Sequence, residues 1–425
     1  MFKTFNNALK VKEIRQRLLF TLLMIVVFRL GNAIPVPFVD SSILKGIFNQ
    51  MGGNILSFMD LLSGGSLGKF SIFALSIYPY ITSSIILQLL TYAIPSLEEL
   101  SKEGEAGQKK IQMYTRYGAV ILSVLEGIAI SNTLFAQAIV AKGFIQEAAI
   151  ILVVVAGSMF LVWLGDLITE KGIGNGISIL IFIGIVSRLP HTARLWGKGV
   201  INGTINPIKA ILILATILLV IVGVILISEG ERRITVQYAK RVVGRKMYGG
   251  QSTHIPMKVN MGGVMPIIFA SSLLALPQTL GLLIGGGFRT FADKYFSMSM
   301  MPGVVIMNVL AVLLIFVFAY FYTAIQFNVV EYSKNLQQQG GFIPGIRPGR
   351  PTGEYMNRIL TRITFVGALA LAILYVLPTI LSAIFSLNIQ FGGTSIIIVV
   401  GVVLETFRQM ESMLLMRHYK GFLNK

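Results

Sequence analysis

The chain contains no cysteine among its 425 residues and only three histidines. The absence of thiols excludes disulfides, thiolate metal sites and thiol redox chemistry. The sequence also lacks an HExxH zinc motif, a GxSxG nucleophile elbow and a phosphate-binding P-loop. We therefore expect a protein that is not an enzyme, with no catalytic residue, no metal site and no cofactor.

Charged residues are scarce as well. They make up 13% of the chain, whereas 54% of the residues are hydrophobic and the mean hydropathy is +0.76. In a soluble domain about a quarter of the residues are charged, so this composition indicates an integral membrane protein. The basic start of the chain leads into an apolar run without a small-residue cleavage site, and we interpret it as an uncleaved anchor.

The apolar runs predict an all-α, polytopic membrane protein with ten transmembrane helices, because a span needs about 20 mostly apolar residues. The spans are expected at residues 18-38, 70-93, 117-135, 148-168, 175-190, 208-228, 262-284, 304-327, 362-382 and 395-414. An even number of spans places both termini on one side of the membrane. With that side taken as cytoplasmic, most of the 36 lysines and arginines fall in cytoplasmic loops, as the positive-inside rule requires.

Two of these loops, at residues 229-261 and 328-361, are strongly basic and longer than a helix connection requires. One interpretation is that their charge only orients the protein and attracts anionic lipid. The other is a docking surface for an acidic partner, with nucleic acid as one candidate. The length of the loops favours the second interpretation.

Five spans end near residue 200 and five follow, so the chain divides into an N-terminal half, 1-200, and a C-terminal half, 201-425. An odd number of spans in each half gives the halves opposite orientations, which is the geometry of an inverted repeat. Secondary transporters share this geometry, but ion-coupled transporters usually place paired ionisable groups at mid-membrane. No obvious relay is formed by the ionisable residues of the spans, Arg29, Glu126 and Asp166. A secondary transporter is therefore kept only as the alternative hypothesis.

Polar residues within the spans gather on the helices expected at 70-93, 117-135 and 262-284. Pro79 and Pro266 are expected to interrupt the first and last of these helices, because proline removes a backbone hydrogen bond. The polar side chains either join helices in the ordinary way or form a seam that can open.

The stretch "GNILSFMDLLSGGSLGKF" at residues 53-70 has an apolar core that is too short to cross a bilayer. A re-entrant helix is one interpretation, since non-spanning structure at membrane depth must be shielded from lipid by protein. An amphipathic helix on the outer membrane face is the other. Asp60 does not decide between them.

Seven stretches, found in order along the whole chain, resemble the bacterial SecY family, which forms the channel of the general protein translocase. They are "SIYPYITSSIILQLL", "EGEAGQKKIQMYTRYG", "ITEKGIGNGISILIF", "AKR", "GVMPIIFASSLL", "GGFIPGIRPGRPT" and "GGTSIIIVV". The resemblance implies two inverted five-helix halves around a central hourglass pore. It also implies that the protein translocates unfolded preproteins across the bacterial cytoplasmic membrane and inserts hydrophobic segments laterally into it.

The resemblance further implies three sets of site residues in the membrane. An apolar ring that narrows the pore falls on Ile77, Ile81, Ile177, Ile181, Ile268 and Val403. A plug under this ring, at about 54-66, includes Ile55, Leu56, Phe58, Met59, Leu61 and Leu62. A lateral gate toward lipid includes Thr82, Gln88, Glu126, Ser271 and Ser272, where Glu126 replaces the glutamine expected in many bacterial relatives.

The partners are implied by the resemblance alone. They are the small subunits SecE and SecG, the motor ATPase SecA, the ribosome, the signal sequence of a preprotein and the lipid bilayer. The motor and the ribosome would dock on the two long basic loops. Our first choice for the contact is Arg347, followed by Arg232, Arg233, Lys240 and Arg241, because a guanidinium can bind phosphate or carboxylate in a bidentate manner.

Overall fold

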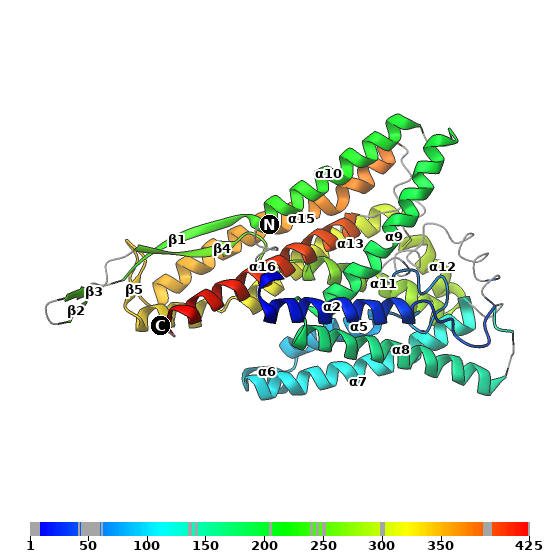
Figure 1. Cartoon of the computed structure of the whole chain (residues 1–425), viewed down its shortest axis with the longest axis horizontal. Helices are drawn as coiled ribbons and strands as arrows, with labels where there is room; N and C mark the ends of the chain where they lie inside the picture. The colour runs from blue at the N-terminus through cyan, green and yellow to red at the C-terminus, as the bar shows by residue number, and fades with distance from the viewer. Residues whose placement is uncertain are drawn as a thin grey trace. The chain divides into compact units, whose positions relative to one another are not determined.

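The computed structural model describes residues 9–40, 43, 60, 63–134, 138–140, 143–203, 206–238, 241–243, 246–248, 252–297, 302–385 and 393–423. They form helices and two small antiparallel sheets (Figure 1). The chain divides into two compact units. Unit 1 comprises Met1–Ile211, Ser271–Val309 and Val402–Lys425, and unit 2 comprises Leu212–Ala270 and Leu310–Gly401. The predicted halves 1-200 and 201-425 are not the same as these two units. They rest on the expected inverted repeat, which stays a prediction.

The helices follow the predicted spans in order along the chain. Those of unit 1 are α2 (Lys12–Gly31), α5 (Tyr78–Ala93), α6 (Pro95–Lys102), α7 (Glu105–Ala129, continued by a π-helical turn at Ile130–Leu134), α8 (Phe144–Lys171), α9 (Gly176–Ile201) and α12 (Gly286–Tyr295). Unit 2 holds α14 (Val329–Gln338) and α15 (Arg350–Phe385). Residues of both units occur in α10 (Pro207–Glu229), α11 (Met265–Ile284), α13 (Gly303–Gln326) and α16 (Gly393–Leu423).

Eight of the described helices are long and apolar enough to cross a membrane. The pair α5 and α6, bent by 100° at a short break, brings the number to nine if it forms one span. The remaining predicted span corresponds to α2, which has 20 residues but includes three arginines, Arg15, Arg17 and Arg29. The helices are therefore consistent with ten spans.

The expected interruptions at Pro79 and Pro266 are wrong. Pro79 lies in the first turn of α5, and Pro266 is the second residue of α11. The backbone N–H groups of a first helical turn have no partner within the helix, so proline is tolerated there and favours helix initiation. The interior proline of α11 is Pro277.

The segment 70–77 was expected to be helical but consists of tight turns, and α5 starts only at Tyr78. Its Phe73 ring stacks between Phe28 of α2 and Phe160 of α8, with centroid distances of 6.1 and 5.9 Å. Gly157 of α8 leaves room for the segment, since a Cβ atom there would overlap the carbonyl oxygen of Ile72. Tertiary packing therefore sets the start of α5.

The turn "GIGNG" joins α8 to α9, as predicted, but α9 is longer than the expected 175-190 span. Asn175 caps it, because its side-chain oxygen accepts hydrogen bonds from the backbone N–H groups of Ile177 and Ser178 at 3.1 and 3.2 Å. The turn is also held by α2 and α16. The N–H of Ile173 donates to the Thr21 hydroxyl, and the N–H of Gly174 donates to the side-chain oxygen of Gln409.

Replacing Asn175 with alanine should lower the free energy of unfolding by about 1 kcal/mol, because two N–H groups at the start of α9 lose their acceptor. Replacement with aspartate keeps the acceptor and should cost much less. Thermal unfolding of the purified chain in detergent measures both variants. An alanine variant as stable as the aspartate variant would contradict the capping role.

The two long basic loops form one structure within unit 2, which we call the basic lobe (229–261 and 328–361). Strands β1 (Glu231–Tyr238) and β4 (Ser252–Lys258) pair antiparallel, with Ile234 opposite Ile255. Strand β5 (Gly341–Phe342), from the second loop, pairs with the other edge of β1. Strands β2 (Arg241–Val243) and β3 (Lys246–Tyr248) form a separate hairpin.

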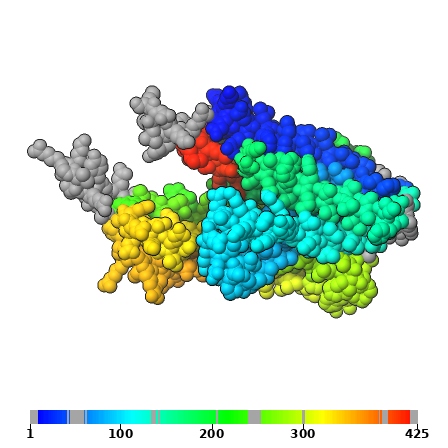
Figure 2. All heavy atoms as spheres, turned by 90° about the horizontal axis from the view of Figure 1, so that it is seen from below, coloured from blue at the N-terminus to red at the C-terminus, as the bar shows by residue number. Residues whose placement is uncertain are grey.

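The basic lobe has its own apolar core, formed by both loops together. Figure 2 shows the green atoms of β1 and β4 beside the yellow and orange atoms of α14 and the start of α15. The buried members of the core are Ile234, Val236, Ile255, Met257, Leu336, Ile343, Met356, Ile359 and Leu360. Two loops that are far apart in the sequence therefore make one folded surface.

Candidate functional site

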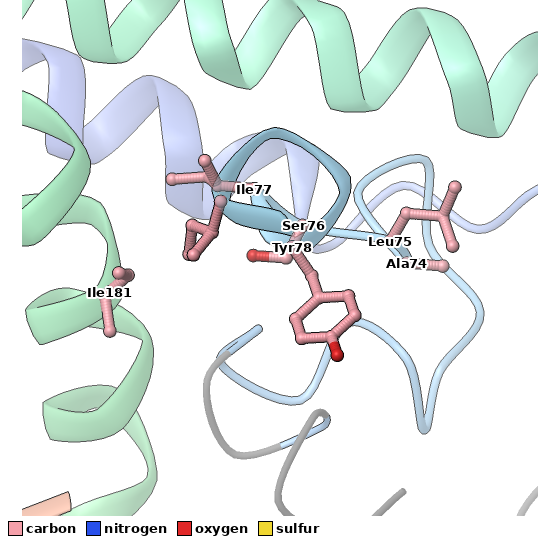
Figure 3. Close-up of a pocket in the computed structure, with 7 residues that line it drawn as sticks. Ala74, Leu75, Ser76, Ile77, Tyr78 and Ile181 are labelled. Carbon is pink, nitrogen blue, oxygen red and sulfur yellow. The ribbon is translucent and has the colours of Figure 1, made fainter. Parts of the chain in front are cut away.

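A small hollow of about 10 Å³, roughly the room that one water molecule needs, lies at the start of α5, within unit 1 (Figure 3). Its lining residues are Ala74, Leu75, Ser76, Ile77, Tyr78, Ile81 and Ile181. Figure 3 shows Ile181 on α9 facing the turn that carries Ile77. Ile77, Ile81 and Ile181 are 1%, 6% and 4% exposed. Three residues of the predicted ring therefore share one apolar wall.

The other predicted ring residues lie elsewhere. Ile177 is half-buried one turn before Ile181 on α9, and its side chain packs against Gly165 of α8. Ile268 is buried in α11, within unit 2, and Val403 is half-buried in α16. A closed ring of all six stays a prediction.

Hydrogen bonds join the helices that carry the predicted lateral gate. The Tyr78 hydroxyl of α5 donates to the carbonyl oxygen of Ser272 in α11 at 2.8 Å. The Ser83 hydroxyl of α5 donates to the carbonyl oxygen of Thr115 in α7 at 2.8 Å. The sequence did not predict the Tyr78 contact, although Tyr78 follows Ile77 in the stretch "SIYPYITSSIILQLL". These bonds hold α5 against both neighbours.

Most of the predicted gate residues are buried. Thr82 and Ser271 are buried in α5 and α11, and Gln88 is half-buried with its amide donating to the Ser84 hydroxyl at 3.2 Å. Glu126 of α7 is 4% exposed, and among the described residues its Oε2 atom has no hydrogen-bond partner. A buried polar atom without a hydrogen-bond partner is destabilising.

The predicted plug is described only in part. Its apolar residues Ile55, Leu56, Phe58, Met59, Leu61 and Leu62 lie outside the described residues. Asp60, Ser63 and Ser66 are described and are buried. The described part of this segment therefore lies against protein.

The predicted partner residues lie in the basic lobe. Arg347, Arg232 and Arg233 are exposed, and Arg233 pairs with Glu231 at 2.7 Å. Arg347 stands between Pro344 and Pro348, and its carbonyl oxygen accepts a hydrogen bond from the Thr352 hydroxyl at 2.9 Å. The backbone of Arg241 lies in β2, and Lys240 lies outside the described residues. Arg347 is thus an exposed cation on a stiff loop.

No cluster of three or more histidine, cysteine, aspartate or glutamate side chains that could hold a metal ion occurs in the part of the chain that the structure describes. The arrangement offers an apolar hollow, a hydrogen-bonded helix contact and an exposed basic surface. Such features suit passage and docking of another molecule.

Comparison with known proteins agrees with this geometry. The SecY family model matches residues 71–407. The "Protein translocase subunit SecY" of Thermotoga maritima is 42% identical over 435 residues, which cover 100% of this chain and 98% of that protein. Two solved structures share the fold. One is "The plug domain of the SecY protein stablizes the closed state of the translocation channel and maintains a membrane seal", at 19% identity and a TM-score of 0.67, covering 94% of this chain and 92% of the other. The second is "Sec61 in the Canine ribosome-channel complex from the endoplasmic reticulum", at 17% identity and a TM-score of 0.63 with the same coverage.

Proposed function

Because the chain belongs to the SecY family and is a protein-conducting membrane channel, we propose that it moves unfolded preproteins across the bacterial cytoplasmic membrane and releases hydrophobic segments sideways into lipid. The apolar hollow at the start of α5 carries this proposal. Branched side chains without hydrogen-bonding groups form a collar that excludes water and ions. Such a collar deforms around a passing chain. Ile177, Ile268 and Val403 complete the proposed ring.

The idle channel is closed by the plug at about 54-66, which includes Ile55, Leu56, Phe58, Met59, Leu61 and Leu62. The related SecY protein of known structure has a plug domain that stabilises its closed state, which supports this part of the proposal. Residues 63–66, at the C-terminal end of the segment, are hydrogen-bonded and largely buried. Displacement of the plug by a preprotein then opens the pore.

The lateral gate opens between α5 and α11. Its opening breaks the hydrogen bond from Tyr78 to Ser272, at a net cost of about 1 kcal/mol. A signal sequence that enters this seam brings apolar side chains to lipid and backbone polar groups to Thr82, Gln88, Ser271 and Glu126. The contact is weak enough to exchange, which suits a gate that opens repeatedly.

Energy for transport comes from partners, in keeping with a sequence that carries no P-loop, HExxH or GxSxG motif. SecA or a translating ribosome docks on the basic lobe through Arg347, Arg232, Arg233, Lys240 and Arg241. The ribosome complex of the related canine channel supports such a contact. SecE and SecG complete the complex, both termini are cytoplasmic, and the halves 1-200 and 201-425 move about the connection between them. A secondary transporter is not favoured, since the relatives are translocase subunits.

Single cysteines test the pore, because an introduced thiol is the only one in this chain. We expect Ile81→Cys and Ile181→Cys to form disulfides with a stalled preprotein that carries one cysteine, in proteoliposomes with SecA and ATP. The crosslinks should require both ATP and a signal sequence.

Matched control positions lie on the same two helices. Ile86 of α5 and Leu189 of α9 are 37% and 41% exposed and do not line the hollow. Cysteines there should crosslink at least tenfold less. A preprotein that crosses the membrane without crosslinking to either Ile81→Cys or Ile181→Cys would overturn the proposed route.

A further inference from the structure

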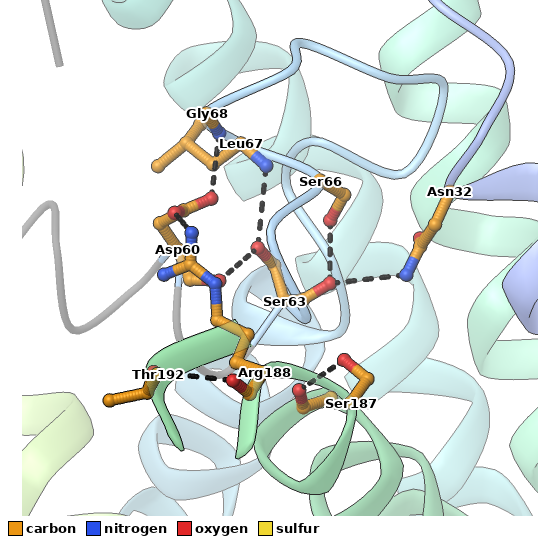
Figure 4. A network of polar contacts seen from close by, with 10 residues as sticks. Asn32, Asp60, Ser63, Ser66, Leu67, Gly68, Ser187, Arg188 and Thr192 are labelled. Carbon is orange, nitrogen blue, oxygen red and sulfur yellow. Dashed lines mark hydrogen bonds and ion pairs between the residues drawn. The ribbon is translucent and has the colours of Figure 1, made fainter. Parts of the chain in front are cut away.

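The C-terminal end of the plug segment, Asp60 with the turn at residues 63–68, is anchored on α9 by an ion pair (Figure 4). The guanidinium of Arg188 pairs with the carboxylate of Asp60, which also accepts a hydrogen bond from the N–H of Gly68 at 2.6 Å. The Asp60 side chain is 3% exposed and the Arg188 side chain 36%. The pair thus joins a buried carboxylate to a cation that reaches the surface.

The turn itself is stiff, because its own groups satisfy one another. The carbonyl oxygen of Asp60 accepts from the Ser63 hydroxyl at 3.0 Å and from the N–H of Gly65 at 2.8 Å. The Ser66 hydroxyl donates to the carbonyl oxygen of Ser63 at 2.7 Å. Asn32, which follows α2, donates to the same carbonyl oxygen at 3.3 Å. The turn can therefore move as one piece when its contacts to the helices break.

Arg188 stands in line with the hollow. It follows Ile181 by seven residues, which is nearly two helical turns and about 10 Å along the axis of α9. Residues seven apart lie on the same helix face. The cation that anchors the turn and the isoleucine that lines the hollow are thus on one face of one helix.

The ionised form of the Asp60 carboxyl is stabilised by its pairing with Arg188. Burial raises the pKa of the Asp60 carboxyl above its ordinary value of 3.8, and the Arg188 guanidinium and the Gly68 N–H oppose this shift by stabilising the ionised form. Removing one partner of such a pair leaves an uncompensated charge and is far more costly than removing both. Loss of Arg188 alone therefore pushes Asp60 toward water, and the turn with it.

We propose that Arg188 is a positioning residue that latches the plug in the closed channel through its ion pair with Asp60, and that the pair breaks when the plug leaves. This inference rests on the proposed function. The free energy needed to break the ion pair is then part of what a signal sequence must supply to open the channel. It acts through Asp60 and the turn at residues 63–68, and not through the apolar side chains of the plug.

The experiment measures release of the turn. Leu67 is fully buried, so the labelling rate of Leu67→Cys with a membrane-impermeant maleimide reports how often the turn leaves its site. The purified channel complex in proteoliposomes, without SecA, is compared in four backgrounds: unchanged, Arg188→Gln, Arg188→Lys and the double variant Asp60→Asn with Arg188→Gln. Arg194→Gln is the matched control, since Arg194 is an exposed arginine on the same helix.

We expect Arg188→Gln to raise the labelling rate about tenfold, because it leaves the buried carboxylate unpaired. Arg188→Lys should raise it less, since it keeps the charge and loses the planar fork. In the double variant the labelling rate should return to within about twofold of the rate in the unchanged protein. This rescue separates a latch from a general loss of packing.

Two outcomes would overturn the latch. One is an unchanged labelling rate in Arg188→Gln, and the other is an equal rise in Arg194→Gln. Crosslinking of a preprotein to Ile181→Cys, measured in the same complexes, tests the pore independently. Persistence of that crosslink with an unchanged labelling rate would remove the latch and leave the proposed function standing.

Discussion

Replacing Gly176 with valine should lower the amount of folded protein in the membrane several-fold. A Cβ atom on Gly176 would overlap the carbonyl oxygen of Gly165 in α8, and that backbone atom cannot rotate away as a side chain can. The two helices would have to separate at the turn that joins them. Overpacking typically costs 1–3 kcal/mol, and we expect about 3 kcal/mol or more here because the obstacle is backbone.

The same helix offers a control. A Cβ atom on Gly197 of α9 would meet nothing within 4 Å, so Gly197→Val should accumulate close to the level of the unchanged chain. Size-exclusion chromatography of the solubilised chain measures the folded fraction of both variants. Equal amounts of folded Gly176→Val and Gly197→Val would refute the close contact between α8 and α9.

Reversing the charge of Arg347 should lower ATP-driven preprotein translocation at least tenfold while leaving the fold intact. The side chain is exposed, so its loss removes no packing, and surface changes of this kind usually alter stability by less than about 0.5 kcal/mol. The prolines on either side and the hydrogen bond from Thr352 hold the position of the cation. A negative charge there repels an acidic partner where the cation attracted it.

Arg350 is the matched control for Arg347. It belongs to the same lobe, its side chain is 92% exposed, and it pairs with Glu354 on its own helix at 3.0 Å. Arg350→Glu makes the same change in net charge and should lower translocation less than twofold. Equal losses in the two variants would mean that the total charge of the lobe matters and that Arg347 has no special role.

The order of the long helices could be predicted from the sequence, because a bilayer accepts only spans with internally satisfied backbones and a fixed minimum length. The eight or nine candidate spans among the described residues are consistent with the ten predicted. The start of α5 could not be predicted from the sequence. The residues 70–77 are as apolar as the helix that follows, and what keeps them out of it is the stacking of Phe73 on Phe28 and Phe160. Contacts between distant segments leave no trace in local periodicity.

The candidate site residues were likewise predictable only in part. The resemblance to the SecY family pointed to Ile77, Ile81 and Ile181, which the structure brings together around one hollow. The Tyr78 contact and the pair of Asp60 with Arg188 were not predicted, since each joins residues far apart in the chain. The joining of the two basic loops into one sheet also escaped prediction, because a two-residue strand such as β5 carries no alternation pattern.

Strand β1 acquires its two neighbours at different moments of biosynthesis. β4 follows it closely, whereas β5 emerges only after α11, α12, α13 and α14 have been made. At about 5–20 residues per second, the far edge of β1 on the nascent chain waits on the order of ten seconds for its partner. An open edge is a template for pairing with other chains. Arg347 follows β5 by a few residues, so the proposed docking cation emerges only once β1 can acquire its second neighbour.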